Sequence, residues 1–469
     1  MSGNSAALAG FVAATRYEDL PPEVVDRIKK SLLDALGCVV YGSSLAASQA
    51  PLRYLDDDLV RRPAVDGGRS AADEAMLNAT FIHTTEYGET FARAVVHPGT
   101  VVVPAALAVC GRRRLTGRDL VTAMTVGFEV DVRLGLAAGH KLIMEQRLHA
   151  PSIWGSFAST AAVANALSFD RGQAAAALGV ASCLVPSALQ EALRQHATVK
   201  DIYQGYASAL GVTAGAMVGS GITGPADWVE PWFAAVIDDY DLAGLVDGLG
   251  ERWNVASGGL RIKTRPVMAM AQPTLEALTG LLRAGPVEAG RVDRVVVESS
   301  GRIEMGRIYR PEGIVSARAA IPFLVAAALV DQPRFLSDTY LTDFIRPEQF
   351  VDARVNAIAD TVELVTDPTF DDNFERAAPG GPDAYQKYEA RVTIHLSDGT
   401  VRTRYADLFA IGTGRMTWDE VAAKFHALTR DRLPPERAEA ILATVGDLEN
   451  CPDVGALAAM VTTSDTPAR

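Results

Sequence analysis

The sequence predicts a mainly α-helical fold in which a large helical domain, contributed by both ends of the chain, is interrupted by a smaller α+β domain. Three observations support this. Ala- and Gly-rich helical segments fill the first half, β-branched strand segments appear only after about residue 265, and helical spacing returns after about residue 405. We therefore expect a helical domain from residues 1–265 and 406–469, and an inserted domain from residues 266–405.

The helices of the first half follow from their end residues and apolar spacing. Residues 21–42 begin with Pro, end at a Gly, and repeat apolar residues every three or four positions. Residues 152–167, 172–185 and 206–221 are poor in bulky side chains, so their helices can approach closely and are expected inside a bundle. Residues 59–73 are expected to form a loop.

The inserted domain is predicted from strand and turn patterns. We expect a helix over residues 273–285, a strand over 291–300, and a hairpin over 388–407, where alternating residues flank an Asp398-Gly399 turn. Beyond it, Thr417 and Glu420 have the spacing of a capping box, and a Pro pair begins the last long helix.

Composition narrows the classes of function. The 469 residues are 48% hydrophobic and 22% charged, as in an ordinary globular protein with a large core. A net charge of −13 disfavours nucleic acid and anionic membranes as partners. No apolar run approaches the roughly 20 residues of a membrane span, and the N-terminus lacks the basic region of a signal peptide. We expect a cytoplasmic protein.

The cysteines are expected to be structural. All four lie far apart in apolar stretches and form no C-x-x-C pair: Cys38, Cys110, Cys183 and Cys451. Buried, inert thiols in a reducing compartment are therefore predicted.

Nucleotide and metal sites are poorly supported. Gly219–Pro225 is Gly-rich, but no strand precedes it and no G-K-[ST] follows, so a helix end and turn is predicted. His83, Glu86, Glu89 and His97 have suitable metal-binding atoms, but their spacing matches no familiar ligand set and H-E-x-x-H is missing. We predict no metal.

Acid–base chemistry without a metal remains. Residues 82–100 hold two of the seven histidines with acidic residues between them. Elsewhere, His149 directly precedes one small-residue helix, Lys200 precedes another, and Lys263 lies at the predicted domain junction, where pockets often form. Each residue alone also fits a buried histidine or a solvated lysine, so spacing leaves its role open.

Several motifs nevertheless occur in an order typical of one family. They are the Asn-x-x-x-x-His, acidic and His-Pro segment within 73–109, GFEVDVRLG at 127–135, and the segments 147–167, 199–225, 260–266 and 392–400. Through them, residues 7–461 resemble the MmgE/PrpD family, which includes 2-methylcitrate dehydratase, cis-aconitate decarboxylase and iminodisuccinate epimerase. The resemblance implies a discontinuous helical domain, an α+β lid domain, a homodimer, and a cofactor-free site for a small anionic carboxylate.

The resemblance also implies site residues. The catalytic residues it implies are His149, His97 and Glu86. The substrate-binding residues it implies are Lys200, Lys263, Thr90 and His83. We choose His149 as the proton shuttle because the unperturbed pKa of histidine lies near the working pH.

Some positions depart from the family pattern and leave the substrate open. Gly88 stands in place of an Asp, Met268 stands where Cys or His is frequent, Gln272 replaces a His, and Phe323 stands where Tyr is frequent. We expect a cofactor-independent lyase, with dehydration of a hydroxy di- or tricarboxylate ranked first. Epimerisation or isomerisation, decarboxylation, and a non-catalytic anion-binding protein on the same fold are the alternatives.

Overall fold

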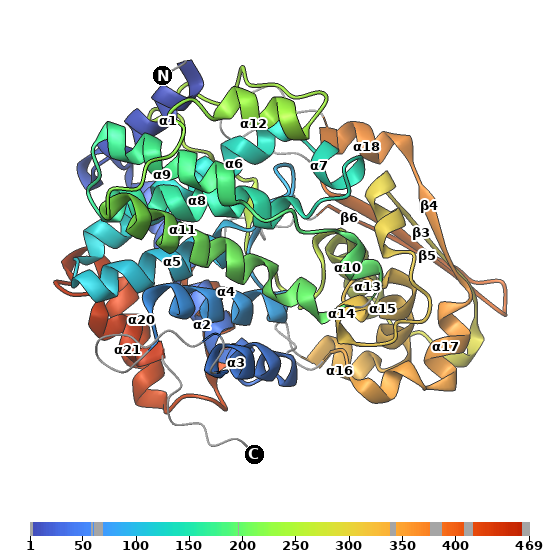
Figure 1. Ribbon diagram of the computed structural model, residues 1–469. Coiled ribbons are helices and arrows are strands. Elements are labelled where there is room, and N and C mark those ends of the chain that lie inside the picture. Colours follow the sequence, from blue (N-terminus) through green and yellow to red (C-terminus); the bar gives the residue numbers. More distant parts are fainter. Residues whose placement is uncertain are drawn as a thin grey trace. The chain divides into compact units, whose positions relative to one another are not determined.

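The computed structural model describes residues 3–57, 60, 69–195, 197–337, 344–375, 387–407 and 416–461. The fold is mainly α-helical, as predicted (Figure 1). The chain divides into two compact units. The helical unit comprises Met1–Glu191, Val199–Leu260 and Thr417–Arg469, and the second unit comprises Ala192–Thr198 and Arg261–Met416. The role of the inserted segment as a lid stays a prediction.

The helical unit is built around α4, α5, α6, α8 and α11, which pack against one another. Its helices are α1 (Gly3–Ala14), α2 (Pro22–Ser43), α3 (Gln49–Asp56), α4 (Ala71–Thr85), α5 (Pro98–Arg113), α6 (Gly117–Ala138), α7 (Lys141–Met144), α8 (Ala150–Ala166), α9 (Arg171–Leu184), α11 (Tyr203–Gly219), α12 (Val229–Val236), α19 (Trp418–Thr429), α20 (Pro435–Gly446) and α21 (Gly455–Val461). All helices predicted in this part of the chain are present, with ends shifted by up to three residues.

Small residues allow the close packing that the sequence predicts. A Cβ atom on Gly211 of α11 would lie 2.5 Å from the main chain of Ser159 on α8. A Cβ atom on Gly127 of α6 would lie 2.8 Å from the carbonyl oxygen of Ala158, also on α8. Because both distances are shorter than any normal contact, glycine is required where α6 and α11 approach α8.

Helix starts follow local capping signals. The Thr417 hydroxyl accepts from the main-chain N–H of Glu420, whose carboxylate accepts from the N–H of Thr417, so the predicted capping box is confirmed. Pro22 begins α2 and Pro98 begins α5, where a missing N–H is harmless.

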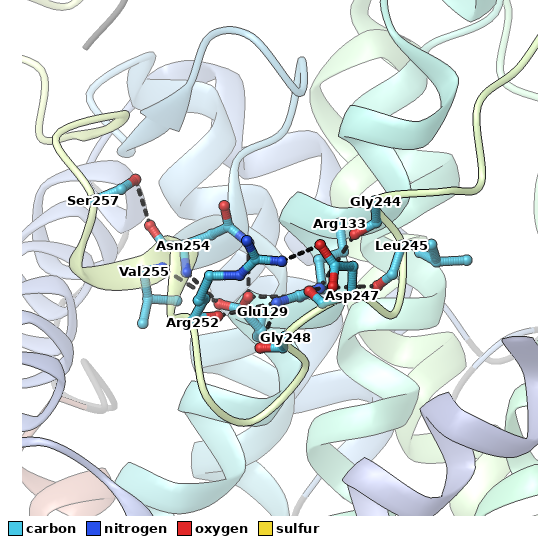
Figure 2. Close-up of polar contacts among 10 residues, drawn as sticks. All are labelled: Glu129, Arg133, Gly244, Leu245, Asp247, Gly248, Arg252, Asn254, Val255 and Ser257. Atoms are coloured by element: carbon cyan, nitrogen blue, oxygen red, sulfur yellow. Dashed lines mark hydrogen bonds and ion pairs between the residues drawn. The ribbon is translucent and has the colours of Figure 1, made fainter. Parts of the chain in front are cut away.

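A buried ion pair on α6 fixes an irregular segment of the helical unit (Figure 2). The Arg133 guanidinium donates to Glu129 at 2.7 Å and to the carbonyl oxygens of five residues between 244 and 252, at 3.0–3.3 Å. The Glu129 carboxylate also accepts from the side-chain amide of Asn254 at 2.7 Å and its main-chain N–H at 2.9 Å. We call residues Glu129 and Arg133 the loop clamp.

The second unit carries a four-stranded sheet in the order β4-β3-β5-β6. β3 (Val292–Ser299) runs parallel to β4 (Val362–Thr366) and antiparallel to β5 (Glu389–Leu396), and β5 pairs with β6 (Val401–Asp407). Its helices are α13 (Gln272–Arg283), α14 (Ile314–Ala317), α15 (Ile321–Val330), α16 (Gln332–Ser337), α17 (Ala353–Ala359) and α18 (Pro368–Glu375). The predicted helix, strand and hairpin are confirmed, with Gly399 at φ 83° in the turn.

Three further predictions have mixed outcomes. Cys38 and Cys110 are buried, but Cys183 is exposed and Cys451 half-buried, because they lie in the last turn of α9 and after a surface 3-10 turn. The predicted loop 59–73 lies mostly outside the described residues, and α4 already begins at Ala71. Gly219–Pro225 follows the end of α11, as predicted.

Within the described ranges, no single helix is long and apolar enough to cross a membrane. One pair, Pro22–Ser43 with Ala46–Asp56, meets the length and hydropathy criteria only together and is bent by 84°.

Candidate active site

A short segment after α4 places a carboxylate in the interior of the helical unit. Glu86 ends α4 in the left-handed conformation, with φ 56°, and its N–H donates to the carbonyl oxygen of His83. This conformation is uncommon for a residue other than glycine and costs on the order of 1 kcal/mol, so surrounding contacts must maintain it. The side chain of Glu86 is only 6% exposed.

Lys200 is the cation that faces this carboxylate. It lies in the 3-10 turn η3 (Thr198–Ile202) directly before α11, and its Nζ forms an ion pair with Oε1 of Glu86. The Lys200 side chain is 5% exposed. Because desolvation offsets much of the attraction in a buried ion pair, stability alone does not explain why this pair is buried.

Two histidines, His83 and His149, lie beside the ion pair and a third, His97, interacts with both, each at a helix end. His83 is in the last turn of α4, His97 precedes the first turn of α5, and His149 precedes the first turn of α8. The ring centroids of His83 and His149 are 5.7 Å apart, and both imidazoles interact electrostatically with Lys200, Glu86 and His97. The structure thus brings together five of the seven predicted site residues: His83, Glu86, His97, His149 and Lys200.

Hydrogen bonds determine which nitrogen of each imidazole carries the proton. Nδ1 of His83 lies 3.2 Å from the carbonyl oxygen of Asp201, and Nδ1 of His97 lies 3.0 Å from that of Glu89. A carbonyl oxygen only accepts, so both Nδ1 atoms donate. The Ser152 hydroxyl donates its proton to the His149 carbonyl at 2.9 Å, so Nδ1 of His149 must donate to that hydroxyl, 3.1 Å away. Each neutral imidazole therefore has its lone pair on Nε2.

The site keeps two of these imidazoles neutral. Burial, followed by the positive charge of Lys200, lowers the pKa of His149 to about 3, although Glu86 opposes the shift. The same two causes lower the pKa of His83 well below its usual value. The choice of His149 as the proton shuttle used the unperturbed pKa of histidine, whereas burial and the adjacent ammonium group lower the pKa of His149 well below that value.

The other predicted site residues are placed differently. The Thr90 hydroxyl donates to the carbonyl oxygen of Val96 at 3.4 Å, within the same segment as Glu86. Lys263 is buried and belongs to the second unit. There, the side-chain amide of Gln272 donates to the carbonyl oxygens of Arg265 and Val267, at 2.8 and 3.1 Å, and so holds the segment that follows Lys263.

Two of the other departures from the family pattern, at Gly88 and Phe323, are explained by local packing. A Cβ atom on Gly88 would lie 2.6 Å from Oγ1 of Thr100 on α5, so a side chain at this position would require Thr100 to shift. Phe323 is buried on α15 with its ring centroid 5.5 Å from that of Phe350, so it fills apolar space. Met268 precedes a 3-10 turn and donates its N–H to the carbonyl oxygen of Arg318.

Sequence reasoning missed two neighbours of the histidines. The carbonyl of Asp201 orients His83, and the ring centroid of Tyr203 lies 5.4 Å from that of His149. The contact of His83 with the main chain of Asp201 could not be read from the sequence. Tyr203 could have been proposed as a neighbour of the site, because it lies three residues after Lys200 at the start of a helix.

A group of buried polar side chains beneath the segment was also missed. They come from α2 and α19: Arg27, Ser31, Asp34 and Lys424. Lys424 forms an ion pair with Asp34 at 2.5 Å and donates to the carbonyl oxygen of Tyr87 at 3.0 Å. Since Lys424 lies between Val421 and Phe425 on the apolar face of its helix, a lysine at that position was a sign of a buried partner.

The geometry defines a class of site. Among the described residues, no group of three or more His, Cys, Asp or Glu side chains is arranged to hold a metal ion. A buried ammonium–carboxylate pair beside three imidazoles with defined tautomers is suited to acid–base chemistry on a small anion.

Comparisons with known proteins agree with this class. The MmgE/PrpD N-terminal domain matches residues 6–240 and the MmgE/PrpD C-terminal domain matches residues 266–450, so the chain belongs to the MmgE/PrpD family. It is 23% identical to a cis-aconitate decarboxylase-like protein of Aspergillus oryzae, with 97% of each chain covered. It is 22% identical to the cis-aconitate decarboxylase of Aspergillus terreus, covering 97% of this chain and 94% of the relative. It is 23% identical to the human cis-aconitate decarboxylase, with the same coverages. The family and these relatives support a lyase-type function.

Proposed function

We propose that this protein is a lyase that acts on a small polycarboxylate and moves protons with its own side chains, without a cofactor. The observation that carries the proposal is the convergence of His83, His97 and His149 on the buried Lys200–Glu86 pair. Lysine and protonated imidazole both donate hydrogen bonds to carboxylates, so the cluster suits an anionic substrate.

Decarboxylation is the reaction we favour, because the decarboxylase relatives align over nearly the whole chain. Lys200 would pair with a substrate carboxylate that is retained. The bond to the departing carboxylate breaks, carbon dioxide leaves, and the electron pair stays on carbon, delocalised toward the retained carboxylate. A proton from an imidazolium then completes the product, so one proton is consumed for each carbon dioxide released.

Entry of the substrate would itself prepare the proton donor. Nε2 of His149 carries a lone pair and no proton, because burial and Lys200 disfavour the imidazolium. A polycarboxylate brings negative charge beside this ring and raises its pKa, so a proton is taken up at Nε2. His149 is our choice for this donor, and Glu86 and His97 are the further acid–base groups.

Dehydration is the second candidate, and the tautomers favour it. A neutral imidazole with its lone pair on Nε2 is a base that can remove a proton next to a carboxylate. The hydroxyl on the neighbouring carbon then leaves as water when the imidazolium formed in the first step returns its proton to it, and the Glu86 carboxylate would stabilise that imidazolium. Both reactions use the same bound carboxylate, so the substrate decides between them.

The test is incubation with a panel of di- and tricarboxylates, cis-aconitate and 2-methylcitrate included, in deuterated water. Trapped carbon dioxide with deuterium in the product supports decarboxylation, and an alkene without carbon dioxide supports dehydration. Deuterium exchange without net conversion indicates an isomerase or epimerase. Binding without exchange or conversion indicates a non-catalytic anion-binding protein and rejects the lyase.

Two variants test the assigned roles. His149→Ala should lower kcat by about 10²–10⁴, the usual contribution of a proton-transfer residue, and an unchanged kcat removes His149 from that role. Lys263→Ala should raise KM if Lys263 binds a substrate carboxylate, and a wild-type KM rejects that role. Glu436→Gln, at an exposed position of α20, is the matched control and should match the wild type.

A further inference from the structure

Glu89 connects the candidate site to its supporting helices in two ways. Its carbonyl oxygen accepts from Nδ1 of His97 at 3.0 Å. Its carboxylate, 1% exposed, accepts from Nη2 of Arg27 at 3.1 Å and from the hydroxyl of Ser31 at 2.7 Å, both on α2. The same residue therefore orients the imidazole with its main chain and is anchored by its side chain.

The anchor also meets the start of α5, the helix that His97 precedes. A Cβ atom on Gly99 would lie 2.6 Å from Oε1 of Glu89, so the carboxyl group packs directly against the first turn of α5. Between the two contacts, Phe91 and Val96 form a β-bridge that closes the intervening segment. Both ends of the segment that carries His97 thus depend on the position of Glu89.

From these contacts we infer that Glu89 is a positioning residue for His97, and that its charged form, held by Arg27 and Ser31, fixes the tautomer and orientation of that imidazole. Loss of the charge removes the ion pair with Arg27. The carbonyl that accepts the hydrogen bond from Nδ1 of His97 can then shift relative to the first turn of α5.

The surroundings of Glu89 make this charge sensitive to pH in the neutral range. Burial raises the pKa of Glu89 to about 7, although Arg27 and Ser31 oppose the shift. The other charged groups that act on it are Asp34 on α2, which raises its pKa, and Lys424 on α19, which lowers it.

Asp131 on α6 is the remaining acidic neighbour. It is fully buried, neither of its oxygens has a hydrogen-bond partner within the described ranges, and burial followed by the charge of Glu89 raises its pKa well above the usual value. Burial and the neighbouring Glu89 carboxylate therefore both favour the neutral form of Asp131, whereas the pKa of Glu89 is about 7. Below about pH 7 Glu89 becomes protonated, so activity should fall as His97 loses its fixed position.

The first test is the pH dependence of kcat for the wild type and three variants. Glu89→Gln should lower kcat by about 10- to 100-fold at pH 8 and flatten the fall of kcat on the acidic side. Glu89→Asp keeps the charge and should retain that acidic fall. Ser31→Ala removes a hydrogen bond that lowers the pKa of Glu89, so the midpoint of the fall should move up by about 0.5–1 pH unit. Parallel profiles that differ only in height would assign Glu89 a merely structural role and overturn the inference.

The first test rests on the proposed function, because kcat can be measured only with a substrate. The second test needs no substrate and so does not depend on the proposed function. In protein with nitrogen-15-labelled histidine, the signals of His97 at pH 8 should show a proton on Nδ1 in the wild type and in Glu436→Gln. Glu89→Gln should show mixed tautomers, with thermal unfolding measured to confirm that it is folded. An unchanged Nδ1 tautomer of His97 in folded Glu89→Gln rejects the inference even if no substrate is found.

Discussion

Two of the buried ion pairs in the helical unit have opposite surroundings. The loop clamp, Glu129 with Arg133, is enclosed by main-chain carbonyl and N–H groups of residues 244–255 (Figure 2). The Glu86–Lys200 pair instead has the imidazoles of His83 and His149 as electrostatic neighbours. Main-chain groups cannot titrate and move only with the backbone, whereas imidazoles can take up protons, and their proton affinity depends on the charges around them.

This difference teaches how to separate a structural from a functional buried charge. Both pairs incur the cost of desolvation, and at the clamp burial raises the pKa of Glu129 although Arg133 and Asn254 oppose it. At the clamp, hydrogen bonds to the main chain offset the cost and fix a segment without regular structure. At the site, the ion pair alters the proton affinity of its neighbours. We therefore expect changes at the clamp to affect stability and changes at the site to affect chemistry.

The largest expected effect is on turnover, at Lys200. Lys200→Met should lower kcat/KM by on the order of 10³-fold, because it removes the buried cation that binds and stabilises negative charge. Steady-state kinetics on the substrate identified from the panel measures this loss, with Glu436→Gln as the control. A loss of less than about 10-fold would mean that Lys200, like the loop clamp, has a structural role, and the proposed difference between the two ion pairs would be wrong.

The next effect is on stability, at the clamp. Arg133→Met should lower the free energy of unfolding by about 3 kcal/mol, because it leaves Glu129 buried without its cation, although protonation of Glu129 limits the loss. Denaturant unfolding measures it, and kcat per folded molecule should stay within about twofold of the wild type. A large fall in kcat with unchanged stability would reverse the roles given to the two pairs.

A smaller effect concerns the dependence of stability on pH. The pKa of His149 is lowered on folding, so between about pH 6.5 and 3 the unfolded chain binds more protons there, and stability falls as the pH falls. His149→Gln should reduce this slope by about 1.4 kcal/mol per pH unit. Glu89 has the opposite effect on stability. Because folding raises its pKa, its contribution to stability increases as the pH falls from about 7 to 4.5.

The wild type and His149→Gln both retain Glu89, so its contribution cancels when the pH dependence of the unfolding free energy is compared between these two proteins. Unfolding free energies at pH 6 and pH 5 give the slope for each protein. Equal slopes in the two proteins would show that His149 titrates normally.

The smallest effect is on anion affinity, at Glu86. Glu86→Gln should tighten the binding of citrate by about 3- to 10-fold, because it removes a buried negative charge that competes for Lys200. Isothermal titration calorimetry measures it. Glu129→Gln is the matched change at the clamp and should leave citrate binding at the wild-type value. Equal effects of the two variants would mean that neither carboxylate is specific to the anion site.

The fold was predictable where structure is set locally. Capping at Thr417 and Glu420, the Pro residues that begin α2 and α5, and the Asp398-Gly399 turn depend on neighbours within a few residues. The exposure of Cys183 was not predictable in this way, because it depends on which face of α9 the rest of the unit covers.

For the site, the sequence by itself determined which residue types were available and in what order: His83, Glu86, His97, His149 and Lys200, each at a helix end that local signals define. Only the tertiary structure decided that Glu86 pairs with a lysine 114 residues away, that His149 has a pKa of about 3, and that the main chain of Glu89 orients His97. The physical reason is one of range. Helix ends are fixed by hydrogen bonds within one turn, whereas desolvation and charge pairing depend on whatever the packed chain places within a few ångströms.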